Sequence, residues 1–414
     1  MKNARVLILT SAHLCRNPRV LKEASTLGTA GYDVTVLSIS TQQRFEQMDV
    51  ELARELPFRR ATVDATASTT RQRRLATFVQ RSATWSARWL CRGFRMQSVH
   101  ALGPAHALLA GARAHAADLT IVHNELAIWA AGALVREGRR VAVDMEDWHS
   151  EDLLEADRRG RPVELLRRAE SFALNACAYS SVPSMSMGAA LVAACRCPPP
   201  IVLRNSFALQ SRSRTHRSAP EEPPAFIWFS QTIGPGRGLE PFFLAWAQTK
   251  NPSCVHLLGE ERAGYRNRLL TLIPPARRAL VHFHRLVTPG ELPLKLTEFD
   301  LGLALEQHKP LSRDLTITNK LLQYLNAGLA VIATDTAGQR EILRAAPSCG
   351  ILVQSNDTPR FAQQLDDLLG NRTRLRACQQ AARAAAVTEF SWEHEAPRLL
   401  AAVERATTAT ALRQ

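Results

Sequence analysis

The sequence predicts an α/β protein made of two doubly wound domains of the Rossmann type. Short apolar runs, typical of buried parallel strands, alternate with amphipathic helical patterns along most of the chain. A chain of 414 residues has room for two such domains, at roughly 100 to 200 residues each. The strand pattern stops at one polar stretch near the middle and then begins again. We therefore expect two similar domains joined by a linker.

The first domain is expected over residues 1–207. Its opening run RVLILTS predicts a strand, and the helix after it begins with Asn17 as cap and Pro18 in the first position. The helix is expected to stop at Gly31, before the second strand YDVTVLSIS. Further elements are expected as strands over 118–123 and 140–145 and as a helix over 127–138.

Residues 208–224, ALQSRSRTHRSAPEEPP, are polar and aperiodic, which predicts a linker. The second domain is expected over residues 225–390, where AFIWFS, VHLLGE, LVHFH, DLGLAL, LAVIATD and GILVQS predict strands. An amphipathic helix is expected over residues 391–414. Since parallel sheets of this kind bind ligands outside the carboxyl ends of their strands, two facing domains predict a ligand cleft between them.

One motif of the second domain reads TNKLLQYLNAGLAVIATD over residues 318–335. It predicts a helix over residues 319–327 that ends at Gly328 and leads into a buried strand. Lys320 and Gln323 lie one turn apart, on the same face of that helix.

A glycine-rich loop, QTIGPGRGLE, follows the first strand of the second domain. Gly234, Gly236 and Gly238 let backbone amides approach phosphate oxygens at a helix start, and Arg237 adds a planar cation. Since turns need glycine in any case, the loop by itself is weak evidence, and Lys320 downstream strengthens the interpretation. The two segments together predict a site for a diphosphate.

Polar residues also follow the strands of the first domain. Glu146, Asp147 and His149 come after the strand RVAVD, where carboxylates beside a histidine suit binding of an acceptor hydroxyl and proton transfer. The alternative is a solvated acidic loop. We expect Arg19 to form an ion pair at the surface. Two further groups are candidates for acceptor binding or for structural roles: His123, Asn124 and Glu125, and His13, Arg16 and Asn17.

The net charge of +14 is unevenly distributed. Residues 59–100 hold nine arginines and a single acidic residue, Asp64. Within them, residues 71–97 interleave arginine with tryptophan, phenylalanine and leucine at helical spacing, which is typical of a helix on an anionic membrane surface. A solvated helix whose aromatic residues face the core is the alternative. No nucleic-acid motif accompanies the charge, so we expect no nucleic-acid partner.

The eight cysteines show no zinc-site spacing, and no apolar run is long enough to cross a membrane. We expect reduced thiols, no structural metal, and a cytoplasmic protein that can bind peripherally to the inner membrane face.

Three segments in this order, NPRVLKEASTLGTAGYDVTVL, TIGPGRGLE and TNKLLQYLNAGLAVIATDTAGQREIL, resemble the retaining glycosyltransferases of family 4, which have the GT-B fold. The resemblance implies a nucleotide-diphosphate sugar as donor, bound mainly by the second domain, and a glycan or polyprenyl-linked acceptor, bound mainly by the first. It also implies that the closing helix packs back toward the first domain. No Asp-x-Asp occurs in the chain, so we expect neither a metal ion nor a cofactor.

The resemblance also implies roles for single residues. Arg237 and Lys320, with Gly236 and Gly238, would bind the donor diphosphate. Gln323 stands where many relatives have the second glutamate of a Glu-x7-Glu pattern, and Leu315 replaces the first. The residues expected at the donor nucleoside or sugar are Gln323, Asn319, Thr318 and Gly259.

Three alternatives to an active transferase stay open at this point. A nucleotide-sugar epimerase of the same architecture would need no acceptor, a catalytically silent scaffold would fit the two missing glutamates, and a nucleic-acid-binding module would use the basic charge.

Overall fold

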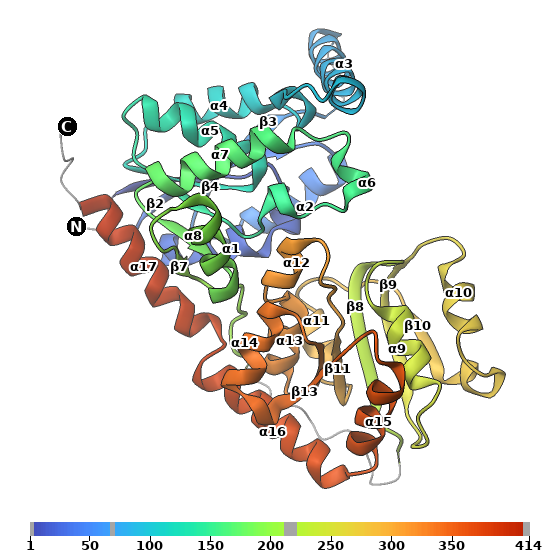
Figure 1. The fold of residues 1–414 in the computed structure, drawn as a ribbon. Coiled ribbons are helices and arrows are strands. Elements are labelled where there is room, and N and C mark those ends of the chain that lie inside the picture. Colours follow the sequence, from blue (N-terminus) through green and yellow to red (C-terminus); the bar gives the residue numbers. More distant parts are fainter. Residues whose placement is uncertain (1–3, 67–70, 211–221, 409–414) are drawn as a thin grey trace. The chain divides into compact units, whose positions relative to one another are not determined.

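The structure is a computed structural model that describes residues 4–66, 71–210 and 222–408. The chain forms two compact units (Figure 1): unit 1 runs to residue 203 and resumes at residue 396, and unit 2 comprises residues 204–395. The division thus precedes the predicted limit at residue 207. Of the predicted linker, residues 211–221 lie outside the described part. Helix α17 (Trp392–Thr408) begins in unit 2 and continues in unit 1.

Unit 1 contains a parallel sheet of seven strands in the order β3-β2-β1-β4-β5-β6-β7. The chain runs outward from β1 to β3 and then returns to the other side of β1 with β4, so the order reverses between β1 and β4. Such a reversal opens a ligand crevice at the carboxyl end of a parallel sheet. The strands are β1 (Arg5–Leu9), β2 (Asp33–Ser40), β3 (Arg59–Asp64), β4 (Leu119–His123), β5 (Val141–Asp144), β6 (Ser180–Val182) and β7 (Ile201–Val202).

Local signals determine where the first helix of unit 1 begins. The side chain of Asn17 accepts a hydrogen bond from the backbone N–H of Val20 (3.1 Å), and Pro18 occupies the first helical position, which confirms both predictions. The helices are α1 (Pro18–Thr29), α2 (Gln43–Ala53), α3 (Arg71–Phe94), α4 (Ala105–Ala114), α5 (Asn124–Arg136), α6 (Glu155–Arg158), α7 (Val163–Ala176) and α8 (Met185–Cys195). Single 3-10 turns are η1 (Leu14–Arg16), η2 (Val99–Ala101) and η3 (His149–Glu151).

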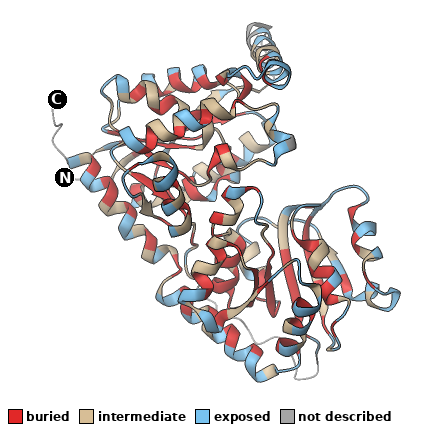
Figure 2. Ribbon diagram, viewed as in Figure 1, coloured by how far each residue is buried: buried red, intermediate tan, exposed pale blue. Residues whose placement is uncertain are grey.

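Unit 2 contains a parallel sheet of six strands in the order β10-β9-β8-β11-β12-β13, which reverses between β8 and β11. Successive residues of β8 enter two different cores: Phe226 and Trp228 pack on one face of the sheet, Ala225 and Ile227 on the other. Figure 2 shows these buried strands between layers of helices. The strands are β8 (Ala225–Ile233), β9 (Cys254–Glu261), β10 (Val281–His284), β11 (Leu301–Ala304), β12 (Ala330–Thr334) and β13 (Gly350–Val353).

The predicted helix over residues 319–327 is confirmed as α13, and Gly328 ends it in the left-handed region (φ +70°). Tyr324 of this helix is fully buried, because Gly302 on β11 leaves room for its ring. A Cβ at position 302 would lie 2.2 Å from that ring. The helices of unit 2 are α9 (Leu239–Trp246), α10 (Tyr265–Thr271), α11 (Leu292–Leu296), α12 (Leu311–Leu315), α13 (Asn319–Ala327), α14 (Ala337–Ala345), α15 (Thr358–Leu369) and α16 (Arg372–Thr388), with the 3-10 turns η4 (Pro275–Leu280) and η5 (Pro347–Cys349).

Among the described residues, no helix combines the length and the apolar character needed to span a bilayer.

Candidate active site

The glycine-rich loop of unit 2 lies where the strand order reverses. It joins β8 to α9, and both Gly236 and Gly238 have positive φ angles (+74° and +76°). A Cβ at Gly238 would lie 2.2 Å from the backbone oxygen of Leu305 and 2.6 Å from Nε2 of Gln307, two residues that follow β11. Glycine at position 238 is therefore required for the loop to approach the end of β11.

A carboxylate that the sequence interpretation did not identify, Glu306, connects the two predicted diphosphate-binding cations. Nζ of Lys320 donates a hydrogen bond to Oε1 of Glu306 (2.6 Å), and Oγ1 of Thr318 donates to the same oxygen (3.3 Å). Burial by itself raises the pKa of Glu306, but Lys320 and Arg237 together hold that pKa below its usual value. Arg237 and Lys320 thus act on one carboxylate, at the carboxyl end of β11.

The ammonium group of Lys320 is buried, with Nζ 5.7 Å from the centre of the Trp228 ring. Arg237 is only partly covered. Gln323 lies one turn after Lys320, and its Oε1 is buried without a hydrogen-bond partner in the described part of the chain. A buried amide oxygen without a partner is unfavourable, so this oxygen is available to a hydroxyl group of a ligand.

A second polar group follows β12, in the segment TDTAGQREIL. Nε2 of Gln339 donates to the backbone oxygen of Thr334 (2.8 Å), and Oγ1 of Thr334 donates to the backbone oxygen of Glu306. Oγ1 of Thr336 and Oε1 of Gln339 are buried and have no hydrogen-bond partner among the residues described. The sequence interpretation missed these side chains, although their segment contributed to the family resemblance.

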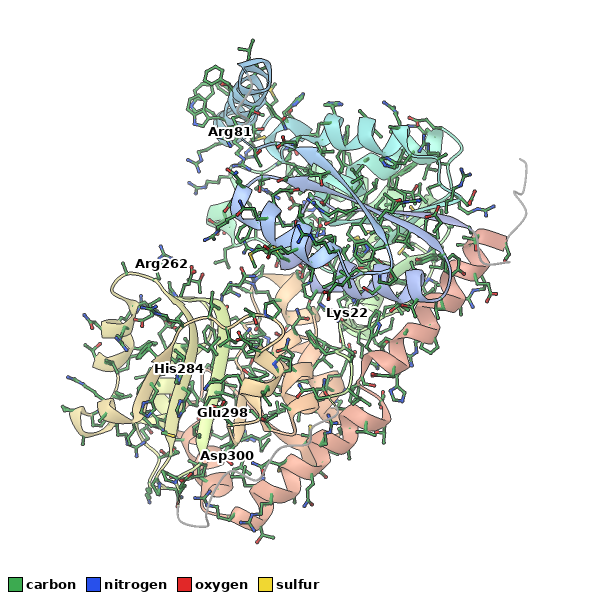
Figure 3. All side chains as sticks on the ribbon, turned by 180° about the vertical axis from the view of Figure 1, so that it is seen from behind. Lys22, Arg81, Arg262, His284, Glu298 and Asp300 are labelled. Atoms are coloured by element: carbon green, nitrogen blue, oxygen red, sulfur yellow. The ribbon has the colours of Figure 1, made fainter. Side chains whose placement is uncertain are left out.

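Two further positions of unit 2 flank the glycine-rich loop. The backbone N–H of Arg262, which follows β9 and is labelled in Figure 3, donates to the backbone oxygen of Ile233 (3.0 Å). Gly259, predicted to touch the donor, has a packing reason to be glycine, since a Cβ there would lie 2.5 Å from the backbone oxygen of Ser230.

Asn319, also predicted to touch the donor, is the first residue of α13 and is half-buried.

In unit 1, Asn124 and Glu146 meet at the reversal between β1 and β4. Oγ1 of Thr10, after β1, donates to Oδ1 of Asn124 (2.6 Å), and Nδ2 of Asn124 donates to a carboxylate oxygen of Glu146. Asn124 has φ +65°, a left-handed conformation that asparagine tolerates better than most residues other than glycine. The hydrogen bonds to Thr10 and Glu146 hold the side chain of Asn124 in place.

The expectation of a surface ion pair for Arg19 is wrong. Arg19 is 3% exposed and donates two hydrogen bonds to Asp144 at the end of β5 (2.7 and 2.6 Å). The reason is that Arg19 lies on the inner face of α1, where the buried carboxylate of Asp144 compensates its charge.

His123 belongs to the same buried network. Its Nε2 lies 2.5 Å from a carboxylate oxygen of Glu23, and the ring has no exposed surface. Burial lowers the pKa of His123, but the attraction of Glu23 and Asp144 outweighs this effect and raises that pKa to about 9. His123 and Glu23 therefore form a buried ion pair at the end of β4.

The cluster after β5 has an unusual electrostatic environment. Burial, together with the neighbouring carboxylates of Asp152 and Glu146, raises the pKa of Asp147 to about 8. For His149, burial opposes the charged form, but Glu125 and Asp147 raise its pKa above the ordinary value. Nε2 of His149 is buried without a hydrogen-bond partner in the described residues. Glu125 also forms a short ion pair with Arg161.

The residues of the first strand-to-helix loop have structural partners. Nδ1 of His13 lies 3.0 Å from Asp49, and its Nε2 accepts from the backbone N–H of Thr41 (3.1 Å). In the described part, His13, Glu46 and Asp49 are the group that could hold a metal ion. Both oxygens of Asp49 already accept backbone N–H groups, those of Leu14 and Cys15, so we interpret the group as a support for the loop. Arg16 stacks over Phe45, and Asn17 caps α1.

Residues 224–371, most of unit 2, match the profile of the protein family described as Glycosyl transferases group 1. No curated protein sequence matches the chain. Among solved structures, the chain is similar to sucrose-phosphate synthase from Thermosynechococcus elongatus, with a TM-score of 0.72 at 14% identity over 99% of this chain and 100% of that one. The fold is that of the GT-B glycosyltransferases.

Two further GT-B structures carry ligands. Anabaena HepE, in complex with UDP-glucose, has a TM-score of 0.68 at 14% identity over 97% of this chain and 100% of that one. A point mutant of TarM from S. aureus, in complex with Fondaparinux, alpha-GlcNAc-glycerol and UDP, has a TM-score of 0.68 at 9% identity over 98% and 100%. These similarities confirm the predicted fold class of two Rossmann-like domains.

Proposed function

We propose that the protein is a retaining glycosyltransferase that moves a sugar from a nucleotide-diphosphate sugar to a hydroxyl of a lipid-linked or envelope glycan, without a metal ion. The observation that carries the proposal is the position of Arg237 and Lys320 around Glu306. Arg237 belongs to the glycine-rich loop, in which position 238 has no room for a side chain. Cations and exposed backbone amides at the carboxyl end of a parallel sheet are suited to hold a diphosphate.

The departing diphosphate gains negative charge as the bond to the sugar breaks. The ammonium group of Lys320 has three N–H donors. One of them donates to Glu306, so two remain for hydrogen bonds to phosphate oxygens. Arg237 is accessible and offers a planar fork to a second oxygen. Both cations would stabilise the leaving group more strongly than the intact donor, which lowers the barrier.

Unit 1 would position the acceptor. Glu146 accepts from Asn124 through one oxygen, and its other oxygen can accept from the acceptor hydroxyl. The raised pKa of Asp147 favours its protonated form, which can donate a hydrogen bond to the acceptor. His149 lies next to both. Of the three candidates for acceptor binding or for structural roles, His123, Asn124 and Glu125, we propose that all support this site.

For the chemical step we propose attack from the face that the diphosphate leaves. The acceptor oxygen bonds to the anomeric carbon, the bond from that carbon to the phosphate oxygen breaks, and the hydroxyl proton passes to the departing phosphate. The protein would contribute positioning and charge stabilisation.

The proposal is tested by thermal shift with UDP, GDP and their sugars. We expect one nucleotide class to raise the Tm, since a ligand at about 100 times its Kd adds about 2.7 kcal/mol to the free energy of unfolding. Arg237→Ala should lose most of the shift. Arg344→Ala, an exposed arginine in the last turn of α14, should keep it.

Three outcomes would contradict the proposal. The first is that no nucleotide changes the Tm, or that both variants respond like the parent protein. The second is an epimerised sugar formed from donor alone, which indicates an epimerase. The third is that the protein binds the donor but transfers no sugar to any glycan acceptor. This result would indicate a catalytically silent scaffold, in agreement with Gln323 and Leu315 in place of the two glutamates. Retention is checked by the anomeric proton of the product in NMR, and metal independence by turnover in EDTA.

A further inference from the structure

Helix α3 presents an apolar face that no described residue of unit 1 covers. Leu75, Phe78, Val79, Trp85 and Trp89 are each more than half exposed, and Trp85 reaches 71%. The sequence allowed the alternative that these side chains face the core, and that alternative is wrong. Figure 2 shows α3 as a largely exposed helix.

Four of these five exposed residues share one side of α3. Leu75, Phe78, Trp85 and Trp89 are spaced three, seven and four residues apart, which places them along one stripe of a helix. The opposite side holds the contact with the body of unit 1: Ala87 and Cys91, one turn apart, pack with Ala101 of η2 in a small buried cluster. The helix is therefore held by small residues and presents its large residues to the outside.

Arginines form a row beside the apolar stripe. Arg81, Arg88 and Arg92 are spaced seven and four residues apart, so they share a side of α3 next to the stripe. Figure 3 labels Arg81 on this helix. Arg81 and Arg92 are exposed, and Arg88 donates to the backbone oxygen of Ala101 (2.9 Å). From Arg71 to Phe94 the sequence contains no acidic residue.

From these observations we propose that α3 docks on an anionic lipid bilayer, with Phe78, Trp85 and Trp89 inserted at the level of the headgroups and the arginine row against lipid phosphates. Tryptophan and phenylalanine beside arginine suit this interface, because apolar burial and charge attraction add. A second copy of the chain is the rival occupant, since the stripe has a spacing close to that of a coiled coil. Pairing two copies of α3 would bring arginine rows together with no acidic partner on either helix, which disfavours it.

The test uses the full chain and sedimentation with vesicles of phosphatidylcholine alone or with about one third phosphatidylglycerol. We expect binding to the anionic vesicles and a blue shift of tryptophan emission, since Trp85 and Trp89 leave water. Phe78→Ser and Trp85→Ser should each lower the partition coefficient roughly tenfold. The double variant Arg81→Ala, Arg92→Ala should lower the partition coefficient by roughly tenfold or more, because two cations no longer contact the anionic surface. High salt should also lower the partition coefficient, because it screens this attraction.

Two matched controls belong to this experiment. Leu294→Ser changes a residue of unit 2 that is 56% exposed, much like Trp89 at 55%, and Arg344→Ala removes an exposed arginine from unit 2. Both should bind vesicles like the parent protein, and all variants should keep the parent Tm because the changed side chains are exposed.

Several results would overturn the proposal. One is no vesicle binding, or equal binding to neutral and anionic vesicles. Another is equal loss in the control variants. A third is a dimer in sedimentation velocity that Phe78→Ser dissociates, which would assign the stripe to a second copy. None of these measurements uses a nucleotide sugar. A negative result would therefore contradict the membrane proposal without testing the proposed transferase activity.

Discussion

At the scale of single residues, the ion pair between Lys320 and Glu306 combines a structural and a catalytic role. Lys320→Met would leave the largely buried carboxylate of Glu306 without the cation that pairs with it, which should cost about 3 kcal/mol in the free energy of unfolding. The double variant Lys320→Met, Glu306→Gln should recover much of that stability, because neither group then carries a charge. Turnover should stay low in both, since the cation for the diphosphate is missing. Urea denaturation and initial rates separate the two effects.

The control for this prediction is Arg237→Ala. Arg237 is partly exposed and should change the free energy of unfolding by less than about 0.5 kcal/mol while lowering turnover sharply. Full turnover of the double variant at saturating donor would show that Lys320 has only a structural role.

The buried pair of His123 and Glu23 predicts a pH dependence of stability. The pKa of His123 is about 9 in the folded protein and about 6.5 in an unfolded chain. The folded state therefore binds a proton more tightly, and the stabilisation is complete below pH 6.5 and lost as the pH rises through 9. His123→Gln should be clearly less stable than the parent protein at pH 6, with a smaller difference at pH 9.5. Denaturation curves at the two pH values measure this, and an equal difference at both would contradict it.

At the scale of elements, the glycine-rich loop offers a matched pair of substitutions. Gly236 and Gly238 have nearly the same φ, so alanine at either carries the same conformational cost of about 1 kcal/mol. At position 238 the new Cβ would also strike the backbone oxygen of Leu305, whereas at position 236 nothing lies within 4 Å. Gly238→Ala should be less stable than Gly236→Ala by about 1 to 3 kcal/mol.

Donor affinity should follow the same order, because the clash displaces the loop that carries Arg237. Calorimetric unfolding and nucleotide titration of the two variants measure both effects. Equal stability of the two variants would show that the contact between the loop and the end of β11 is not rigid.

At the scale of the whole molecule, the chain passes between its two units after Leu203 and again after Glu395. Arg204 and Glu395, the first and last residues of unit 2, form a buried ion pair (3.2 Å), and Phe207 and Ser391 form a β-bridge just inside them. The two ends of unit 2 are thus joined to each other. No residue pattern predicted this, because the partners are almost two hundred positions apart in the sequence.

The sequence by itself determined the features that depend on local interactions. Two doubly wound units, the cap at Asn17, the helix over residues 319–327 and its stop at Gly328 follow from periodicity, capping and glycine conformation, which act within a few residues. The tertiary structure alone decided that Glu306 joins Arg237 and Lys320, that Arg19 is buried against Asp144, and that the aromatic side of α3 faces outward. Contacts between distant segments set these features, and an amphipathic pattern does not say which side of a helix the rest of the protein covers.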